Sequence, residues 1–106
     1  SDNRLPIGLG GEVFSAAALE ISDRKGNRPW YREHVNEYIL DNLNDFAHNA
    51  PEVPVEKRHP EASFTVDTIE ELLFVEGAIK SFVAEHNQND FVTTEWLIRY
   101  VDRKSA

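Results

Sequence analysis

One carboxylate in this sequence stands where it could hold a metal ion. Asp67 ends the β-prone run at residues 62–67, and a helix is predicted to begin directly after it. In open α/β sheets, ligands bind at the carboxyl edge of the strands. Mg²⁺ takes one or two protein carboxylates together with substrate phosphates, so Asp67 is a candidate Mg²⁺ ligand. The alternative is that Asp67 caps the following helix, because aspartate is a favoured capping residue.

Other residue types that often do chemistry are not arranged for it. The glycines of residues 8–11 lack the Lys-Ser/Thr of a phosphate loop and the spacing of a dinucleotide fingerprint, so they indicate a tight loop. No two histidines are three or four residues apart, and the cysteines of common zinc sites are missing. His48 and His59 flank a proline-rich crossing and are interpreted as solvated loop residues.

The first half of the chain is predicted to hold a strand-like run at residues 12–14 and two helices. Ser15 suits the N-cap of a helix from Ala16 to about residue 24, and Gly26 suits the position just past its end. A second helix is predicted over residues 29–43, because proline suits a first turn and apolar residues recur at helical spacing. Its apolar face comprises Tyr31, Val35, Tyr38, Ile39 and Leu43.

The second half is predicted to hold a strand over residues 62–67 and two more helices. Thr68 and Glu71 have the spacing of a capping box at the start of a long apolar helix, and a last helix begins near Thr93. The order predicts an α/β fold that is helix-rich and has few strands. Its strands are too few for a parallel sheet covered on both faces, which indicates a single domain, residues 1–106, that is a fragment.

The composition excludes several classes of function. The chain has 106 residues and a net charge of −8 without a Lys/Arg cluster, so a nucleic-acid backbone would be repelled. Its apolar runs are far shorter than the roughly 20 residues of a spanning helix, which argues against a membrane protein. The absence of cysteine excludes disulfides, and the cytoplasm is the default location. The absence of methionine favours a piece excised from a longer chain.

Three segments carry a family resemblance, in the same order along the chain. Residues 10–20 (GGEVFSAAALE) resemble a G-x-E-V-F-S-x-x-A-L-E motif, and residues 31–39 (YREHVNEYI) resemble R-E-H-V-T-P-Y-I. Residues 64–71 (FTVDTIEE) resemble T-V-D-T-P-E-D. This set is similar to the spore-coat polysaccharide cytidylyltransferases, relatives of the acylneuraminate and 3-deoxy-manno-octulosonate cytidylyltransferases.

The resemblance implies a nucleotide-binding α/β sandwich, of which this chain would be the helix-rich carboxyl-terminal part. It also implies an enzyme that joins cytidine monophosphate from CTP to an acidic or amino sugar and releases pyrophosphate, for polysaccharide or glycan biosynthesis. It implies that Asp67 is one of two aspartates holding Mg²⁺, and that Arg32, Glu33 and His34 line the sugar pocket. Arg32 could hold an anionic group with two hydrogen bonds. The alternative for these three residues is an exposed helix face.

The sequence departs from the family in ways that limit this interpretation. Asn36 and Glu37 replace the family's Thr-Pro, and Ile69 replaces its proline. The amino-terminal half, with its nucleotide loop and first metal aspartate, is absent, so the chain alone is expected to be inactive. The alternative function is a non-enzymatic dimerisation or interaction module. A homo-oligomer is expected, because an apolar patch should be left bare at Tyr31, Phe64, Phe74, Phe82 and Trp96.

Overall fold

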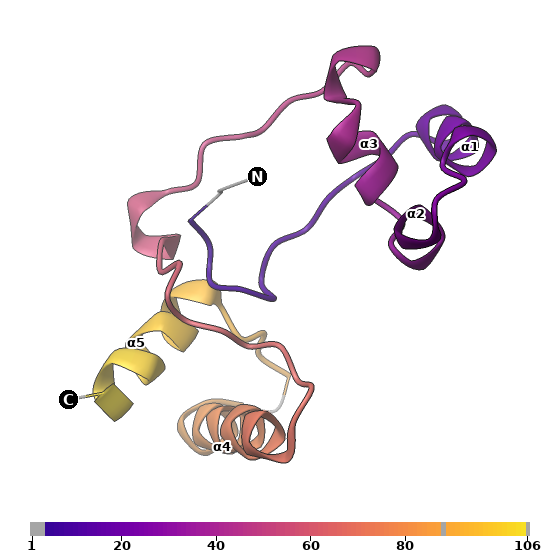
Figure 1. Cartoon of the computed structure of the whole chain (residues 1–106). Coiled ribbons are helices and arrows are strands. Elements are labelled where there is room, and N and C mark those ends of the chain that lie inside the picture. Colours follow the sequence, from indigo (N-terminus) through magenta and orange to yellow (C-terminus); the bar gives the residue numbers. More distant parts are fainter. Residues whose placement is uncertain (1–3, 88, 106) are drawn as a thin grey trace. The chain divides into compact units, whose positions relative to one another are not determined.

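The structure is a computed structural model, and it describes residues 4–87 and 89–105 (Figure 1). Its contacts divide the chain into two units. The first unit comprises the chain up to Gly10 together with the chain from Glu52 onward, and the second runs from Gly11 to Pro51. The elements in chain order are α1 (Ala16–Lys25), α2 (Pro29–Glu33), α3 (Glu37–Asp41), η1 (Leu43–Asp45), η2 (Val55–Lys57), α4 (Ile69–Glu85) and α5 (Thr94–Ser105).

Helix α1 begins and ends where the sequence predicts. The Ser15 hydroxyl accepts a hydrogen bond from the Ala18 N–H at 3.0 Å, which satisfies one of the free amides of the first turn. At the other end Gly26 donates its N–H to the Ser22 carbonyl. A Cβ at Gly26 would stand 2.6 Å from that carbonyl oxygen, so this close approach of the backbone requires glycine.

The single helix predicted over residues 29–43 is wrong, because the structure breaks it into α2, α3 and η1. The break begins at His34, whose backbone is extended. The residues that follow, Val35 and Asn36, are weak helix formers, so the interruption costs little locally. The break lets two aromatic residues meet edge to face, because the Tyr31 and Tyr38 rings lie 5.4 Å apart. Tertiary packing therefore outweighs the helical periodicity in this segment.

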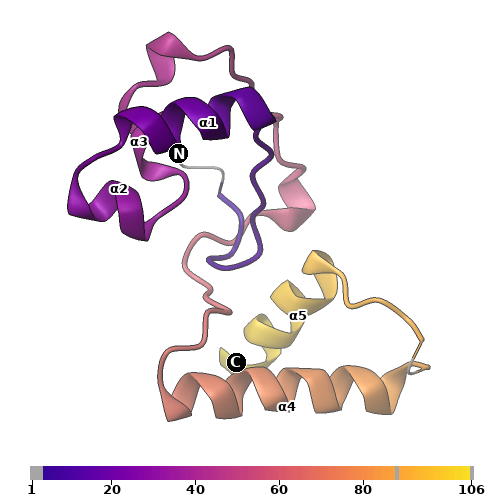
Figure 2. The same ribbon diagram turned by 90° about the vertical axis from the view of Figure 1, so that its right-hand side faces the viewer.

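The core of the first unit lies between α4 and α5. Phe82 and Ala78 of α4 are buried against Trp96 and Tyr100 of α5, with Phe74 partly buried beside them. The Phe82 and Trp96 rings meet edge to face at 5.2 Å, and Trp96 stacks on Tyr100 at 5.5 Å. Figure 2 shows α5 on one side of α4, running obliquely to it. Large aromatic side chains supply much of the apolar area that so small a unit can bury.

The α/β sandwich expected from the sequence is wrong, because the described residues form helices and almost no strand. Their β pairing is one parallel bridge between Ile7 and Ser63. In it the Ile7 N–H donates to the Ala62 carbonyl and the Phe64 N–H donates to the Ile7 carbonyl, each at 2.8 Å. A β-prone run becomes a strand only where a neighbour completes its hydrogen-bond ladder. Residues 12–14 have no such neighbour in the described part of the chain, and Val13 is fully exposed.

The apolar patch expected at five aromatic residues is also wrong. Phe82 and Trp96 are only 4% and 6% exposed, and Tyr31, Phe64 and Phe74 are half-buried. The exposed apolar surface of α4 lies instead on its aliphatic residues. Aromatic spacing alone did not show which face of α4 packs against α5, because the helix is apolar on both faces.

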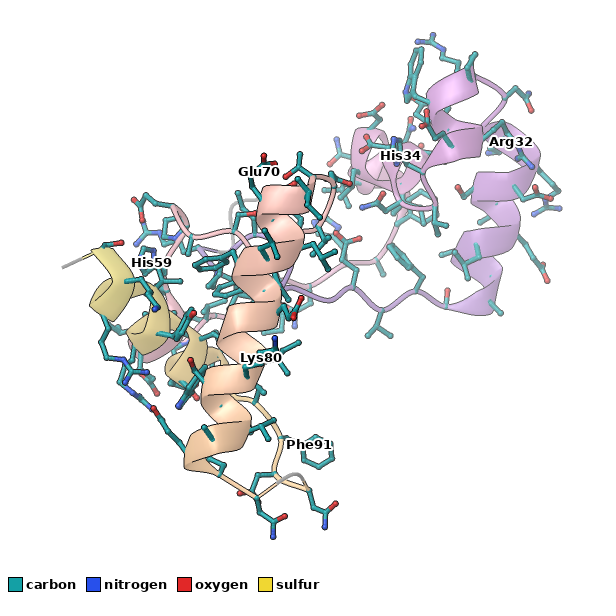
Figure 3. All side chains as sticks on the ribbon, turned by 90° about the horizontal axis from the view of Figure 1, so that it is seen from below. Arg32, His34, His59, Glu70, Lys80 and Phe91 are labelled. Carbon is teal, nitrogen blue, oxygen red and sulfur yellow. The ribbon has the colours of Figure 1, made fainter. Side chains whose placement is uncertain are left out.

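The α4–α5 core predicts contrasting effects for two phenylalanines of the same unit. Replacing buried Phe82 with alanine should lower the free energy of unfolding by about 3–5 kcal/mol, because it leaves a cavity among aromatic rings. Phe91 is 91% exposed (Figure 3), so Phe91→Ala should change that free energy by less than about 0.5 kcal/mol. Urea unfolding followed by tryptophan fluorescence would measure both. Equal losses in the two variants would contradict this assignment of the core.

Candidate functional site

Asp67 stands next to the N-terminus of α4, where Thr68 and Glu71 form the predicted capping box. The Thr68 hydroxyl accepts a hydrogen bond from the Glu71 N–H at 3.2 Å. The Glu71 carboxylate in turn accepts from the N–H groups of Thr68 at 2.9 Å and Asp67 at 3.0 Å. The capping box is thereby confirmed. These hydrogen bonds hold the backbone of Asp67 in place without using its side chain.

The pKa of Glu71 reflects this arrangement. The hydrogen bond from the Asp67 N–H is the largest cause that lowers the pKa of the Glu71 carboxyl, and the hydrogen bonds with Thr68 add to it. Donors aimed at a carboxylate favour its charged form. Glu71 is therefore an anion fixed at the positive end of α4, where the helix dipole also favours negative charge.

The carboxylate of Asp67 takes no part in capping α4. It is exposed, and no hydrogen bond or ion pair of this carboxylate is found among residues 4–87 and 89–105. One free carboxylate suits Mg²⁺, which commonly completes its octahedron with water and phosphate oxygens. The described residues contain no group of three or more His, Cys, Asp or Glu side chains that could hold a metal. Asp67 could therefore supply one ligand to Mg²⁺, whereas the described residues around it do not form a complete metal site.

Arg32, Glu33 and His34 lie at the end of α2 in the second unit, so the structure does not bring them into one unit with Asp67. All three are exposed, and Figure 3 labels Arg32 and His34. The Arg32 guanidinium donates to the Asp23 carboxylate at 2.9 Å and to the Asp23 carbonyl at 3.0 Å. His34 Nε2 lies 4.0 Å from the Glu33 carboxylate.

The contact between Arg32 and Asp23 limits what Arg32 can bind. Both terminal nitrogens are already donors to Asp23, yet the two side chains are 55% and 70% exposed. Exposed ion pairs contribute little to stability, so an anionic ligand could compete for this guanidinium. Arg32, Glu33 and His34 lie on an exposed surface, as the alternative interpretation expected. Their role in binding sugar stays a prediction.

The first two resembling segments meet in the second unit. The Asn36 side-chain amide donates to both oxygens of the Glu12 carboxylate, at 3.2 and 3.4 Å. Nearby, the Tyr31 hydroxyl donates to Asp41 at 2.8 Å, and this hydrogen bond raises the pKa of the tyrosine. Asn36 is one of the positions that depart from the family motif, and here it connects the segment before α1 to the segment before α3.

His59 lies in an environment that the sequence does not predict. Its place beside a proline-rich crossing predicts a solvated loop residue, but its side chain is only 21% exposed. Its Nε2 lies 3.0 Å from the Asp102 carboxylate of α5, and its Nδ1 lies 3.4 Å from the Glu61 carboxylate. The His59 N–H donates to the Arg4 carbonyl. His59 therefore connects the loop before Ser63 to α5, and no pattern along the sequence indicates a contact across 43 residues.

An open pocket of about 500 Å³ lies at α5 and the end of α4, lined by Glu85, His86, Trp96, Arg99, Asp102 and Arg103. Its carboxylate Glu85 accepts a hydrogen bond from the Trp96 indole at 3.1 Å, which is the main cause of a lowered pKa of that carboxyl. Arg103 stands over the Trp96 ring at 5.9 Å. These contacts brace α4 against α5, and none of the four predicted site residues lines the pocket.

Comparisons with known proteins add no assignment. No protein-family model, curated protein or solved structure matches the chain. Among the described residues, no helix is both long and apolar enough to cross a bilayer. The structure defines a small helix-rich protein of two units.

The capping geometry separates Thr68 from its neighbour Asp67 by experiment. Thr68→Ala removes the hydroxyl that accepts from Glu71, so it should cost about 1 kcal/mol, or lower Tm by about 4–8 °C for a chain of this size. Asp67→Ala should leave Tm close to that of the wild type, because the Asp67 carboxylate makes no capping bond. Thermal melts followed by circular dichroism would compare them. A larger loss for Asp67→Ala would show that Asp67 is the cap after all.

The lowered pKa of Glu71 predicts a pH-dependent contribution to stability. Its carboxyl binds protons less readily folded than unfolded, so its contribution is present above the ordinary glutamate pKa. It is lost as the pH falls through the lower folded pKa. Glu71→Gln should therefore lower Tm at pH 7, and its difference from the wild type should shrink below pH ~4. The matched control is Glu70→Gln at the exposed neighbouring position; the same trend there would contradict a specific role for Glu71.

Proposed function

We propose that this chain forms a metal-binding and sugar-side part of a cytidylyltransferase, which activates a sugar with CTP for surface polysaccharide or glycan biosynthesis. Two observations support the proposal. Three segments resemble motifs of that family in the same order, at residues 10–20, 31–39 and 64–71. The residue that the third motif makes a metal ligand, Asp67, has an exposed carboxylate with no hydrogen bond or ion pair in the described part of the chain.

The free carboxylate of Asp67 is the observation that carries the proposal. The competing explanation for an aspartate just before a helix is that its side chain caps that helix. Here Thr68 and Glu71 already perform the capping. Because Glu71 also holds the Asp67 N–H, the carboxylate is presented from a backbone with restricted freedom. The Asp67 carboxylate is held in position but makes no capping bond. Such a carboxylate suits a Mg²⁺ ligand, because Mg²⁺ commonly binds together with substrate phosphates.

Each residue has a defined part in the proposed reaction. The sugar hydroxyl forms a bond to the α-phosphorus of CTP and loses its proton, while the α–β phosphoanhydride bond breaks and pyrophosphate leaves. Mg²⁺, when bound, neutralises the charge that builds up on the phosphate oxygens. Asp67 supplies one anionic ligand to that ion. Arg32 holds an acidic group of the sugar with its two terminal nitrogens, in exchange for its exposed contacts with Asp23.

These 106 residues are not expected to catalyse the reaction alone. The sequence holds no glycine- and arginine-rich nucleotide loop, so CTP should bind to this chain very weakly or not at all. Binding of CTP then requires residues outside this sequence. The proposal places the enzyme in the cytoplasm.

The test is Asp67→Asn in the intact gene product. Loss of one anionic ligand should lower the rate of pyrophosphate release with CTP and sugar by on the order of 10²–10³. Tm should stay near that of the wild type, because asparagine is uncharged but similar in size and the capping is done by Thr68. Glu70→Gln is the matched control, since it removes an exposed first-turn carboxylate three residues away, and it should retain full activity.

Three outcomes would overturn the proposal. Near-normal turnover of Asp67→Asn at limiting Mg²⁺ would remove Asp67 from the metal site. An intact gene product that releases no pyrophosphate from CTP with any acidic or amino sugar would remove the activity. Micromolar affinity of the 106-residue chain for CTP, measured by calorimetry, would contradict the expectation that CTP binds elsewhere.

A non-enzymatic dimerisation or interaction module is the second candidate function. One observation favours it: α4 exposes a line of aliphatic side chains on the face away from α5. Exposed apolar surface of this kind commonly marks a contact with another protein. A gene product that binds neither CTP nor Mg²⁺ but associates through α4 would favour this candidate over the enzyme.

A further inference from the structure

Helix α4 has two apolar faces, and the fold uses only one of them. Phe74, Ala78 and Phe82 pack toward α5. The opposite face, here called the outer stripe, remains exposed, with Ile69 61%, Leu72 46%, Leu73 60%, Ile79 52% and Val83 40% accessible. In Figure 2 no other described segment of this unit lies along that side of α4. The outer stripe follows the alternating three- and four-residue spacing by which one helix packs along another.

Two charged residues interrupt the outer stripe at positions that belong to the same face. Glu76 and Lys80 continue its spacing near the middle of α4, where Figure 3 labels Lys80. The Lys80 ammonium lies 2.7 Å from the Glu76 carboxylate, and the Lys80 and Glu76 side chains are 74% and 48% exposed. The hydrogen bond and the charge of Lys80 lower the pKa of the Glu76 carboxyl, which favours the charged form of Glu76. The stripe is thus locally neutral on a chain of net charge −8.

The order of these charges decides which partner fits the outer stripe. Two copies of α4 in antiparallel register can place Leu72 of each copy opposite Val83 of the other. In that register the middle of one helix meets the middle of the other, and Glu76 of each copy lies beside Lys80 of the second copy. The same contact occurs twice, as a two-fold interface requires. In a parallel, in-register pair Glu76 would instead face Glu76, and Lys80 would face Lys80.

We propose that the outer stripe of α4 is a homodimer interface in which two copies of the helix pack antiparallel. Apolar contacts at both ends of the stripe drive the association, and the two Glu76–Lys80 pairs between copies set its direction. Antiparallel helices also place their dipoles in the favourable orientation. The acidic remainder of the chain opposes association elsewhere, which confines it to this neutral strip. The inference does not depend on the cytidylyltransferase proposal.

Engineered disulfides test the direction of the pairing. The chain contains no cysteine, so a bond can form only where cysteines are introduced. The double variant Leu72→Cys/Val83→Cys should give a covalent dimer under mild oxidation on a non-reducing gel. Within one helix the two positions are about 16 Å apart, too far for an internal disulfide. Each single variant, the matched control, should remain mostly uncrosslinked. Strong crosslinking of Leu72→Cys alone would indicate parallel packing and overturn the proposal.

Charge reversal tests the role of the central pair. Glu76→Lys and Lys80→Glu each create like charges at the interface, and each should weaken dimerisation by about tenfold in sedimentation equilibrium. The double reversal Glu76→Lys/Lys80→Glu should restore the wild-type dissociation constant. Circular dichroism melts of all variants would confirm that they fold. A wild-type chain that stays monomeric at millimolar concentration, or reversals without effect, would overturn the proposal.

Discussion

The packing of aromatic rings between α4 and α5 is the constraint on which the first unit depends. Phe82, Trp96 and Tyr100 are each at most 6% exposed, and they contact one another through edge-to-face and stacked geometry. The unit has no sheet to bury its apolar residues against, since its β pairing is a single bridge in the described residues. Loss of this contact would leave α4 with little more than the contact between Phe74 and Phe64 in the described part of the unit. Polar contacts such as Glu85 with Trp96 surround the rings and do not replace them.

The orientation imposed by this packing determines what α4 shows to solvent. Once Phe74, Ala78 and Phe82 face α5, the helical period places the aliphatic outer stripe on the opposite side. A helix with one apolar face needs no further partner. A helix with two such faces has either a second contact or an exposed patch that favours association. The proposed dimer and the fold therefore have the same origin, the apolar residues on two sides of one helix.

The position of Asp67 depends on a local interaction instead. Thr68 and Glu71 set where α4 begins, and the hydrogen bond from the Asp67 N–H to Glu71 fixes the residue before it. Because capping is complete without Asp67, its side chain contributes little to the fold. A carboxylate that the fold does not use is available to a ligand, and this availability gives Asp67 a stronger claim to function than Arg32, whose guanidinium is already bound to Asp23.

Local interactions decided what the sequence could predict. Ser15 as the cap of α1, Gly26 at its end and the Thr68–Glu71 capping box were predictable, because each depends on residues within four positions of one another. The position of Asp67 directly before Thr68, the N-cap of α4, followed from the same signals.

Contacts between residues far apart in the sequence are decided only by the tertiary structure. Among the described residues, the β-prone run at residues 62–67 has no neighbouring strands with which to form a sheet. The helix predicted over residues 29–43 breaks to pack Tyr31 on Tyr38, and His59 contacts Asp102. Only packing could choose which apolar face of α4 is buried, because hydrophobic periodicity is the same for a face that meets α5 and for one that meets another molecule.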